Sequence, residues 1–142
     1  MFQRTSLSLA DARNAVAAIL RATSEKDNPA AVVVVDDYGE LLCCARQDGA
    51  PSRMLRRARA KAYTSANLGL DTVVFRDQDQ VVKTEERTLN DWGDPMITSL
   101  QGGLAIKVNG KVVGAISCSG NSTERDEELA GIGLKAMGLP LD

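Results

Sequence analysis

The chain contains no histidine among its 142 residues, and aromatic residues make up only 4% of it. Imidazole is the usual general base near neutral pH and the commonest side-chain ligand of metals, so both roles must fall to other groups. The residue pattern also contains no EF-hand spacing, Walker motif, Cys-x-x-Cys pair or histidine-based metal motif. The sequence therefore predicts no metal site and a proton-transfer chemistry that does without imidazole.

The chain also lacks an excess of basic residues and a long apolar run. With 17 basic and 19 acidic residues, the formal net charge is -2, which excludes the broad positive surface typical of nucleic-acid binding. The longest apolar run, residues 30–35, is far shorter than a membrane span, and the first residues lack the apolar core of a signal peptide. We expect a cytoplasmic protein with no nucleic-acid or membrane partner.

Three cysteines are too few, and odd in number, for a disulfide framework. Cys43 and Cys44 are adjacent on a predicted strand, where neighbouring side chains point to opposite faces, and we expect both to be reduced core or near-core residues. Cys118 precedes a predicted helix start, which would lower the pKa of its thiol and make it a nucleophile if it is exposed. We expect Cys118 to be buried, so the exposed nucleophile is the alternative.

Periodic apolar residues and punctuating turn residues divide the chain into helices and strands. Ser8 followed by Asp11 forms the pattern of a capped helix start, and Ser52 is the expected N-cap of the next helix. Asn109-Gly110 predicts a two-residue hairpin turn, because a type I′ turn needs positive φ at both central residues. The expected elements are a helix over residues 9–25, strands over 30–35 and 40–46, a helix over 53–68, strands over 102–108 and 111–118, and a helix over 124–137 that begins after Ser122 or Thr123.

Residues 70–96 are the least periodic part of the chain, and we expect one short helix and a mobile loop there. The length fits one domain over residues 1–142. The order helix, hairpin, helix, irregular segment, hairpin, helix is typical of an α+β arrangement, in which helices cover an antiparallel sheet. It does not fit a doubly wound parallel sheet.

Short motifs in a fixed order run along nearly the whole chain. They occupy residues 7–12, 34–39, 46–50, 60–66, 102–106, 109–116, 119–120 and 126–127. Together these motifs resemble the GlcG/HbpS family of haem-binding-like proteins, which also includes the C-terminal domain of PduO. The resemblance implies a profilin-like α/β sandwich, with an antiparallel sheet of about five strands flanked by helices, assembled as a homo-oligomer. Members are linked to haem or corrinoid binding, in some cases through histidine; since this chain has none, no cofactor is expected and haem is disfavoured.

The predicted helix over residues 53–68 has an unusually basic N-terminal half, where cations oppose the helix dipole. Guanidinium groups bind carboxylates in a bidentate manner, so Arg46, Arg53 and Arg57 are candidates to grip an anionic small molecule. A solvated face or a subunit interface is the alternative explanation of these charges. Trp92, which we place in a loop, either packs against the sheet edge or a partner subunit, or roofs the ligand pocket.

Two glycine-containing pairs, Gly102-Gly103 and Ser119-Gly120, stand at the ends of the second predicted hairpin. If the hairpin brings those ends together, the missing side chains let a ligand approach the backbone closely, and the amides near Gly120 can hold an oxyanion. The alternative is that the pairs are only a strand entry and a strand-to-helix turn.

Proton transfer without imidazole falls to Asp48, Lys61 and Tyr63. Together with the anion-binding residues, they predict a small-molecule catabolic enzyme or binding protein acting on a small oxygenated carboxylic acid, by isomerase, hydratase or lyase chemistry without a redox cofactor. One alternative is a haem or corrinoid binding or sensing protein, with Cys, Met, Tyr or Lys as the axial ligand and the same arginines on the propionates. A third is an oligomeric scaffold without a ligand.

Overall fold

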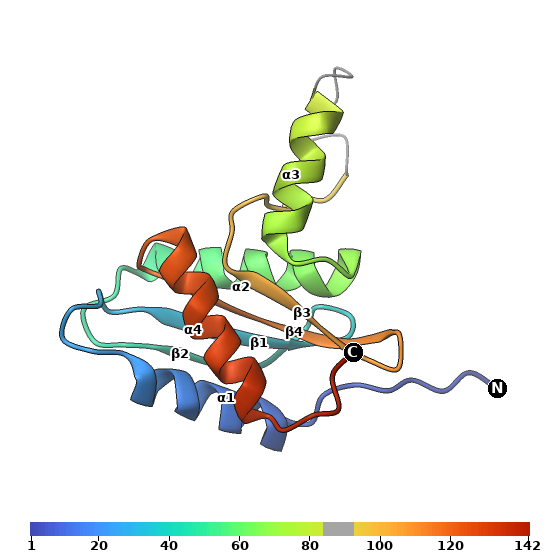
Figure 1. The fold of residues 1–142 in the computed structure, drawn as a ribbon, viewed down its shortest axis with the longest axis horizontal. Helices are drawn as coiled ribbons and strands as arrows, with labels where there is room; N and C mark the ends of the chain where they lie inside the picture. The colour runs from blue at the N-terminus through green and yellow to red at the C-terminus, as the bar shows by residue number, and fades with distance from the viewer. Residues whose placement is uncertain (84–92) are drawn as a thin grey trace.

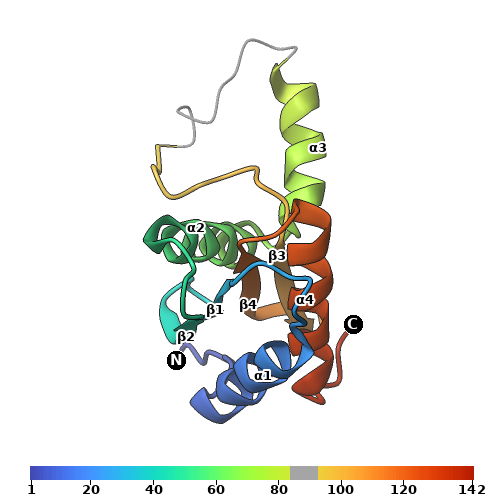
Figure 2. The same cartoon turned by 90° about the vertical axis from the view of Figure 1, so that its left-hand side faces the viewer.

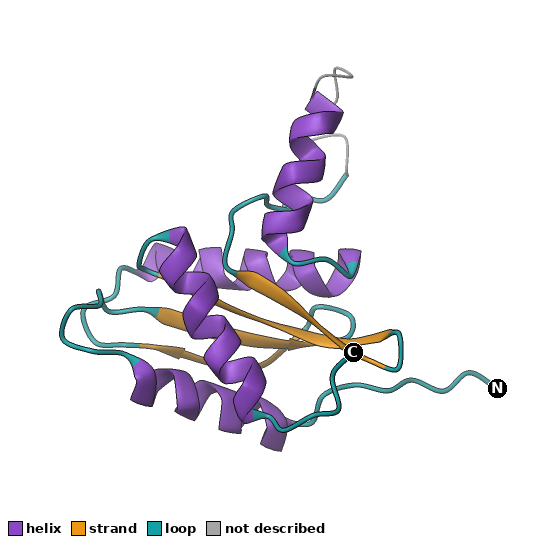
Figure 3. Ribbon diagram, in the orientation of Figure 1, coloured by secondary structure: helices purple, strands orange, loops and turns teal. Residues whose placement is uncertain are grey.

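A four-stranded antiparallel sheet with helices on both faces forms the body of the protein (Figures 1 and 3). The computed structural model describes residues 1–83 and 93–142, and the strands lie in the order β2-β1-β4-β3. The predicted α+β class and both hairpins are confirmed, although the described sheet has four strands rather than about five. The elements are α1 (Leu9–Ala22), β1 (Ala31–Asp36), β2 (Leu41–Arg46), α2 (Ser52–Leu68), α3 (Thr72–Lys83), β3 (Gly103–Val108), β4 (Lys111–Ser119) and α4 (Thr123–Ala136).

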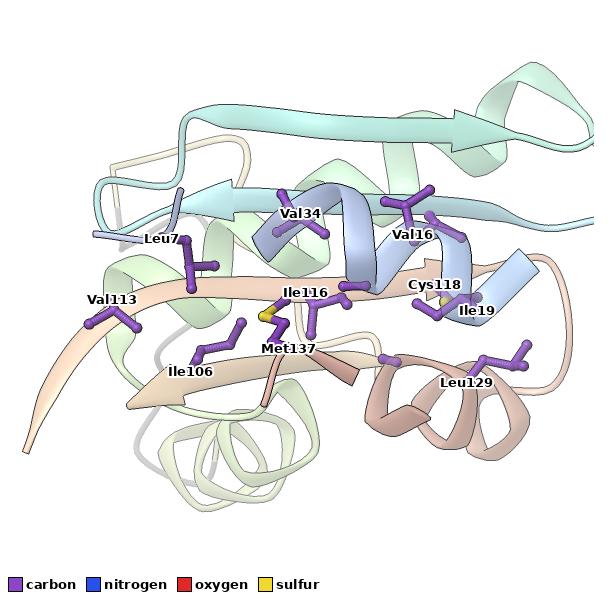
Figure 4. Close-up of a cluster of buried hydrophobic side chains, with 14 residues drawn as sticks. Leu7, Val16, Ile19, Val34, Ile106, Val113, Ile116, Cys118, Leu129 and Met137 are labelled. Carbon is purple, nitrogen blue, oxygen red and sulfur yellow. The ribbon is translucent and has the colours of Figure 1, made fainter. Parts of the chain in front are cut away.

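Strand β1 shows why the sheet needs helices on both faces. Its first five residues are buried, and alternate side chains point to opposite sides. Val32 and Val34 belong to the core formed with α1 and α4, whereas Val33 and Val35 pack with α2. Figure 2 shows α2 on one side of the sheet and α1 and α4 on the other. The larger core cluster, on the side of α1 and α4, is drawn in Figure 4.

The capping box predicted at the start of α1 is present. Asp11 N donates to Ser8 Oγ at 3.1 Å, and Ser8 N donates to Asp11 Oδ2 at 3.0 Å. The helix ends at Ala22, before the predicted residue 25. Thr23 leaves the helical conformation, and its hydroxyl donates to the carbonyl of Leu20 at 2.9 Å, which satisfies an acceptor that a further turn would have used.

Helix α2 begins one residue earlier than expected and is tied to β4. Pro51, not Ser52, occupies the N-cap position, and no side chain caps the helix there. Ser119 Oγ lies 3.7 Å from Met54 Sδ, and Ser117 Oγ donates to the carbonyl of Ala58. These contacts hold the N-terminal half of α2 against the end of β4. None of the helices in the described residues is long and apolar enough to cross a membrane.

The turn between β3 and β4 has the backbone that the sequence predicts. Asn109 has a φ of 51° and Gly110 a φ of 73°, so both central residues are left-handed, as a type I′ turn requires. Gly110 N also donates to Asp142 Oδ2 at 2.7 Å, which places the C-terminus beside this turn.

Helix α3 confirms the short helix expected within residues 70–96, and it projects away from the sheet (Figure 1). At its base, Gly103 N donates to Thr72 Oγ1 at 2.9 Å, and Ala105 N donates to Asp71 Oδ1 at 2.9 Å. These side chains satisfy amides of β3, which is an edge strand of the described sheet. The loop expected after this helix, with Trp92, falls largely outside the described residues.

Candidate functional site

Helix α2 carries arginines on both flanks of the stripe that faces the sheet. At 3.6 residues per turn, Arg53 and Arg57 lie together on one flank. Arg56 and Arg59 lie together on the opposite flank, and all four side chains are exposed. The basic half of the helix therefore contributes to two separate surfaces.

The first flank borders a cavity of about 240 Å³ at the start of α4, which we call the Lys61 cavity. Arg53 and Arg57 are its exposed residues on α2, whereas Lys61 and Asp126 are each 2% exposed. The predicted site residues that the cavity brings together are Arg53, Arg57, Lys61, Ser119 and Gly120. The rest of the lining comes from Met54, Leu100, Asn121, Thr123 and Asp126.

Two buried partners hold the Lys61 ammonium. Lys61 Nζ donates to Asp126 Oδ2 at 3.2 Å and to the carbonyl of Cys118 at 2.9 Å. The second oxygen, Asp126 Oδ1, accepts from Asn121 N at 3.0 Å. Burial lowers the pKa of Lys61, and the Asp126 carboxylate opposes that shift. A buried ion pair is therefore one wall of the cavity, and Asp126, which was not among the predicted site residues, is part of it.

Gly102 and Gly103 lie against the same lysine from the start of β3. A Cβ atom on Gly102 would lie 2.8 Å from Lys61 Nζ, and the φ of +125° at this position favours glycine. A Cβ atom on Gly103 would lie 2.6 Å from the carbonyl oxygen of Lys61. The two ends of the second hairpin thus meet at Lys61, and both glycines are buried there.

Arg46 and Asp48 lie elsewhere. They line a separate open cleft of about 560 Å³ with residues from the end of α1. Arg46 Nη1 donates to the carbonyl of Ala50 at 2.6 Å. Strand β1 separates them from the Lys61 cavity, because Ala31 pairs with Arg46 on one side and with Ser119 on the other. Within this chain, Arg46 and Asp48 therefore do not act on the same cavity as Lys61.

Tyr63 also points away from Lys61. Its hydroxyl donates to Asp94 Oδ2 at 2.5 Å, and this bond raises the pKa of Tyr63. Two residues along a helix rotate a side chain by about 200°, which separates the two groups. Trp92 lies outside the described residues. The proton-transfer trio of Asp48, Lys61 and Tyr63 is thus not assembled within one chain.

The opposite flank of α2 borders an apolar groove of about 150 Å³ beside the edge strand β2, which we call the Cys44 groove. Cys44 is exposed, so the expectation that it is a core or near-core residue is wrong. Its side chain is on the α2 side of the sheet, opposite Val33, but α2 packs mainly on the other three strands and leaves β2 open. The groove is lined by Val33, Leu41, Cys44, Leu55, Arg56 and Arg59.

The other two cysteines are less accessible. Cys118 is 0% exposed, and burial raises the pKa of its thiol. The expected burial of Cys118 is confirmed, and it excludes the alternative of an activated nucleophile, because desolvation outweighs the effect of the neighbouring helix start on the thiol pKa. Cys43 is half-buried and packs against the core on the α1 side. The described cysteines and carboxylates do not gather in groups of three or more that could hold a metal ion.

We predict that Cys44 is the first thiol to react in the folded protein, because it is the exposed cysteine. The measurement is the rate of reaction with a water-soluble aromatic disulfide, followed by absorbance. Cys44→Ser should abolish the fast phase, whereas Cys43→Ser and Cys118→Ser should leave it in place. A fast phase that survives in Cys44→Ser would contradict the exposure assigned to this residue.

Asp27 and Arg125 join the loop after α1 to the start of α4. The Arg125 guanidinium donates to both Asp27 oxygens, at 2.9 and 3.0 Å, and lowers the pKa of Asp27 to about 2 from an ordinary value of 3.8. A carboxyl with a depressed pKa in the folded state contributes stability above its unfolded pKa and loses it as the pH falls through the folded value.

We therefore predict that stability attributable to Asp27 is present above about pH 4 and is lost between about pH 4 and pH 2. Melting temperatures measured across this range should fall less steeply with acid in Asp27→Asn than in the wild type. Asp48→Asn is the matched control, because Asp48 is an exposed carboxylate that lines the same open cleft of about 560 Å³ as Asp27. Equal pH dependence in Asp27→Asn and the wild type would contradict the assigned shift.

Residues 7–135 match the model of a family described as haem degrading protein HbpS-like. An uncharacterized 15.0 kDa protein in the dhaT-dhaS intergenic region of Citrobacter freundii is 31% identical over 128 residues, which is 90% of this chain and 89% of that protein. A crystal structure of an HbpS double mutant from Streptomyces reticuli is 27% identical, with a TM-score of 0.85 over 98% of this chain and 92% of that one. The crystal structure of a PduOC:haem complex is 22% identical, with a TM-score of 0.82 over 97% and 98%.

These similarities confirm the resemblance predicted from the motifs and correct the expectation about cofactors. The expectation that no cofactor is involved, with haem disfavoured by the missing histidine, is wrong, because the family whose model matches is described as haem degrading. Histidine is only one of several haem ligands, since thiolate, thioether and phenolate groups also bind the iron. The expected isomerase, hydratase or lyase activity has no support among these relatives.

Proposed function

The chain belongs to the HbpS-like family, and from this premise we propose that it binds haem or a closely related tetrapyrrole. The observation that carries the proposal is the Cys44 groove, an apolar surface on an open sheet edge that combines an exposed thiol with two arginines. A flat apolar ring with two carboxylates and a central metal needs this combination of groups.

Each part of the groove fits one part of a haem. Leu41, which is 46% exposed, and the half-buried Leu55 offer apolar contact to the ring. Arg56 and Arg59 are three residues apart on one helix face, so their guanidiniums can bind the two propionates. Neither arginine forms an ion pair with a residue of the described ranges. Cys44 supplies sulfur, which is a haem ligand in other proteins.

Bound haem would supply electron-transfer or oxygen chemistry at this surface. The residues of this chain would hold and shield it: Cys44 as ligand, Arg56 and Arg59 on the carboxylates, and Leu41 against the ring. At about 150 Å³, the groove is smaller than the roughly 300 Å³ at which pockets for large ligands begin. We therefore propose that a second copy of the chain covers the outer face of the ring, in a homo-oligomer.

The test is a titration of the purified apo-protein with hemin, followed by the Soret absorbance and by the molar mass in solution. We expect a saturable change at a fixed stoichiometry and an oligomer in the loaded state. Cys44→Ser should move the Soret maximum, because the ligand changes. The double variant R56Q/R59Q should weaken hemin binding about tenfold, the effect of one lost charge-assisted contact on a partly exposed surface.

Matched controls separate specific from general effects. Cys43→Ser removes the neighbouring thiol, and R13Q/R21Q removes two exposed charges from α1. Neither should change the Soret maximum or the affinity. The absence of any saturable change would overturn tetrapyrrole binding, whereas saturable binding unaffected by Cys44→Ser and R56Q/R59Q would exclude the Cys44 groove as the site.

A further inference from the structure

We infer that the Lys61 cavity binds a small carboxylate that carries a hydroxyl or carbonyl oxygen beside the carboxylate group. This site is separate from the proposed tetrapyrrole surface, because the Lys61 cavity and the Cys44 groove lie on opposite flanks of α2. A tetrapyrrole on one flank leaves the other flank open to a second ligand.

The charges of the cavity favour an anion. Arg53, Arg57 and Lys61 bring three positive charges, and Asp126 brings one negative charge that Lys61 Nζ already binds at 3.2 Å. Neither Arg53 nor Arg57 forms an ion pair with residues 1–78 or 93–142. The positive charge of Arg57 lies close enough to Lys61 to lower its pKa further. One helical turn separates the two guanidiniums, so both can contact the same carboxylate.

The size of the cavity and its donors limit the ligand. Its volume of about 240 Å³ lies below the roughly 300 Å³ at which pockets for drug-sized ligands begin, which suits a short acid. An ammonium has three N–H donors, and Asp126 and the Cys118 carbonyl use two of those on Lys61. The third donor, together with the Thr123 hydroxyl in the cavity lining, can bind a second oxygen of the ligand.

The buried ion pair itself supports a binding role. A protein in which apolar residues of similar volume replace a buried ion pair is often equally stable or more stable. The stability of the fold alone therefore does not explain why Lys61 and Asp126 are present. Several features hold the ammonium in one place: the Cys118 carbonyl, the Asp126 carboxylate that Asn121 N supports, and Gly102, which lacks the Cβ atom that would displace Nζ. A charge fixed by such a supporting shell is what recognition of a small anion requires.

The test is a titration of the ¹⁵N-labelled wild-type chain with sodium lactate, monitored by backbone amide resonances. Lactamide, which is neutral, and sodium propionate, which lacks the second oxygen, are the matched probes, with sodium chloride at equal ionic strength as reference. We expect saturable shifts for Gly102, Ser119 and Gly120 with lactate, severalfold weaker binding of propionate and none of lactamide. The variant R53Q/R57Q should weaken lactate binding at least tenfold, whereas R13Q/R21Q should not change it.

Several outcomes would overturn the inference. Lactate shifts that do not saturate, that equal those from lactamide, or that spread over the surface would each exclude a specific site, and these wild-type measurements do not depend on any variant folding. Haem propionates present the same carboxylate group, so hemin is titrated into R53Q/R57Q as well. Unchanged hemin affinity supports a separate site for a free acid, whereas a tenfold loss would assign the cavity to the tetrapyrrole.

Discussion

Replacement of Lys61 by methionine is expected to lower the free energy of unfolding by about 3–5 kcal/mol, because it strands a buried charge. Methionine fills similar space but leaves the Asp126 carboxylate, which is 2% exposed, without its cation. The carbonyl of Cys118 also loses a donor at 2.9 Å. Urea unfolding followed by circular dichroism measures the loss, with the midpoint and slope fitted separately.

The double variant K61M/D126N separates the effect of charge from that of packing. Asparagine removes the negative charge and keeps a side-chain oxygen that can accept from Asn121 N, as Asp126 does at 3.0 Å. Since most of the cost lies in the unpaired buried charge, we expect the double variant to recover about half of the lost stability or more. A double variant no more stable than K61M would show that lost packing, not charge, explains the effect.

Gly103→Ala is expected to lower the free energy of unfolding by about 1–3 kcal/mol through overpacking. The added methyl would lie 2.6 Å from the carbonyl oxygen and 2.9 Å from the carbonyl carbon of Lys61. Both are backbone atoms of α2, so the helix must shift relative to β3 to relieve the contact. The shift would also disturb the Lys61 ammonium, so this variant should weaken lactate binding as well as stability. Urea unfolding and the lactate titration are the two measurements.

Gly131→Ala is the matched control, because it adds the same methyl group where there is room for it. Apart from the adjoining backbone of α4 itself, no described atom lies within 4 Å of a Cβ built at this position. Alanine is a better helix former than glycine, so we expect unchanged stability or a gain of up to about 1 kcal/mol. Equal stability of Gly103→Ala and Gly131→Ala would mean that α2 and β3 are not as closely packed as the structure places them.

Local sequence signals predicted most of the fold. The Ser8–Asp11 capping box and the Asn109-Gly110 turn depend on residues close together in the chain, and both are present. The apolar, β-branched run over residues 30–35 forms a strand as predicted, and this strand, β1, is an inner strand of the described sheet. Helix ends were predicted less well. The periodic pattern predicted a longer α1, but the Thr23 hydroxyl donates to the Leu20 carbonyl, which would accept from a backbone amide if the helix continued.

The candidate site was only partly predictable. Lys61 and Asp126 are 65 positions apart, and lysine is seldom buried, so no spacing in the sequence indicated their pairing. Grouping Arg46 with the arginines of α2 assumed that the end of β2 lies beside the start of α4, but β1 lies between β2 and β4. The helical period places Arg53 and Arg57 on one flank of α2, but Arg56 and Arg59, on the opposite flank, were not among the predicted site residues.

By itself, the sequence determined which elements form and how the two hairpins turn, since capping, turn conformation and alternation are interactions among near neighbours. Only the tertiary structure decided that Cys44 is exposed, and that Lys61 is enclosed with Asp126. The physical reason is that burial depends on how far α2 extends across the sheet and on which segments meet at its edges. Those contacts join residues distant in the chain, and no local pattern encodes them.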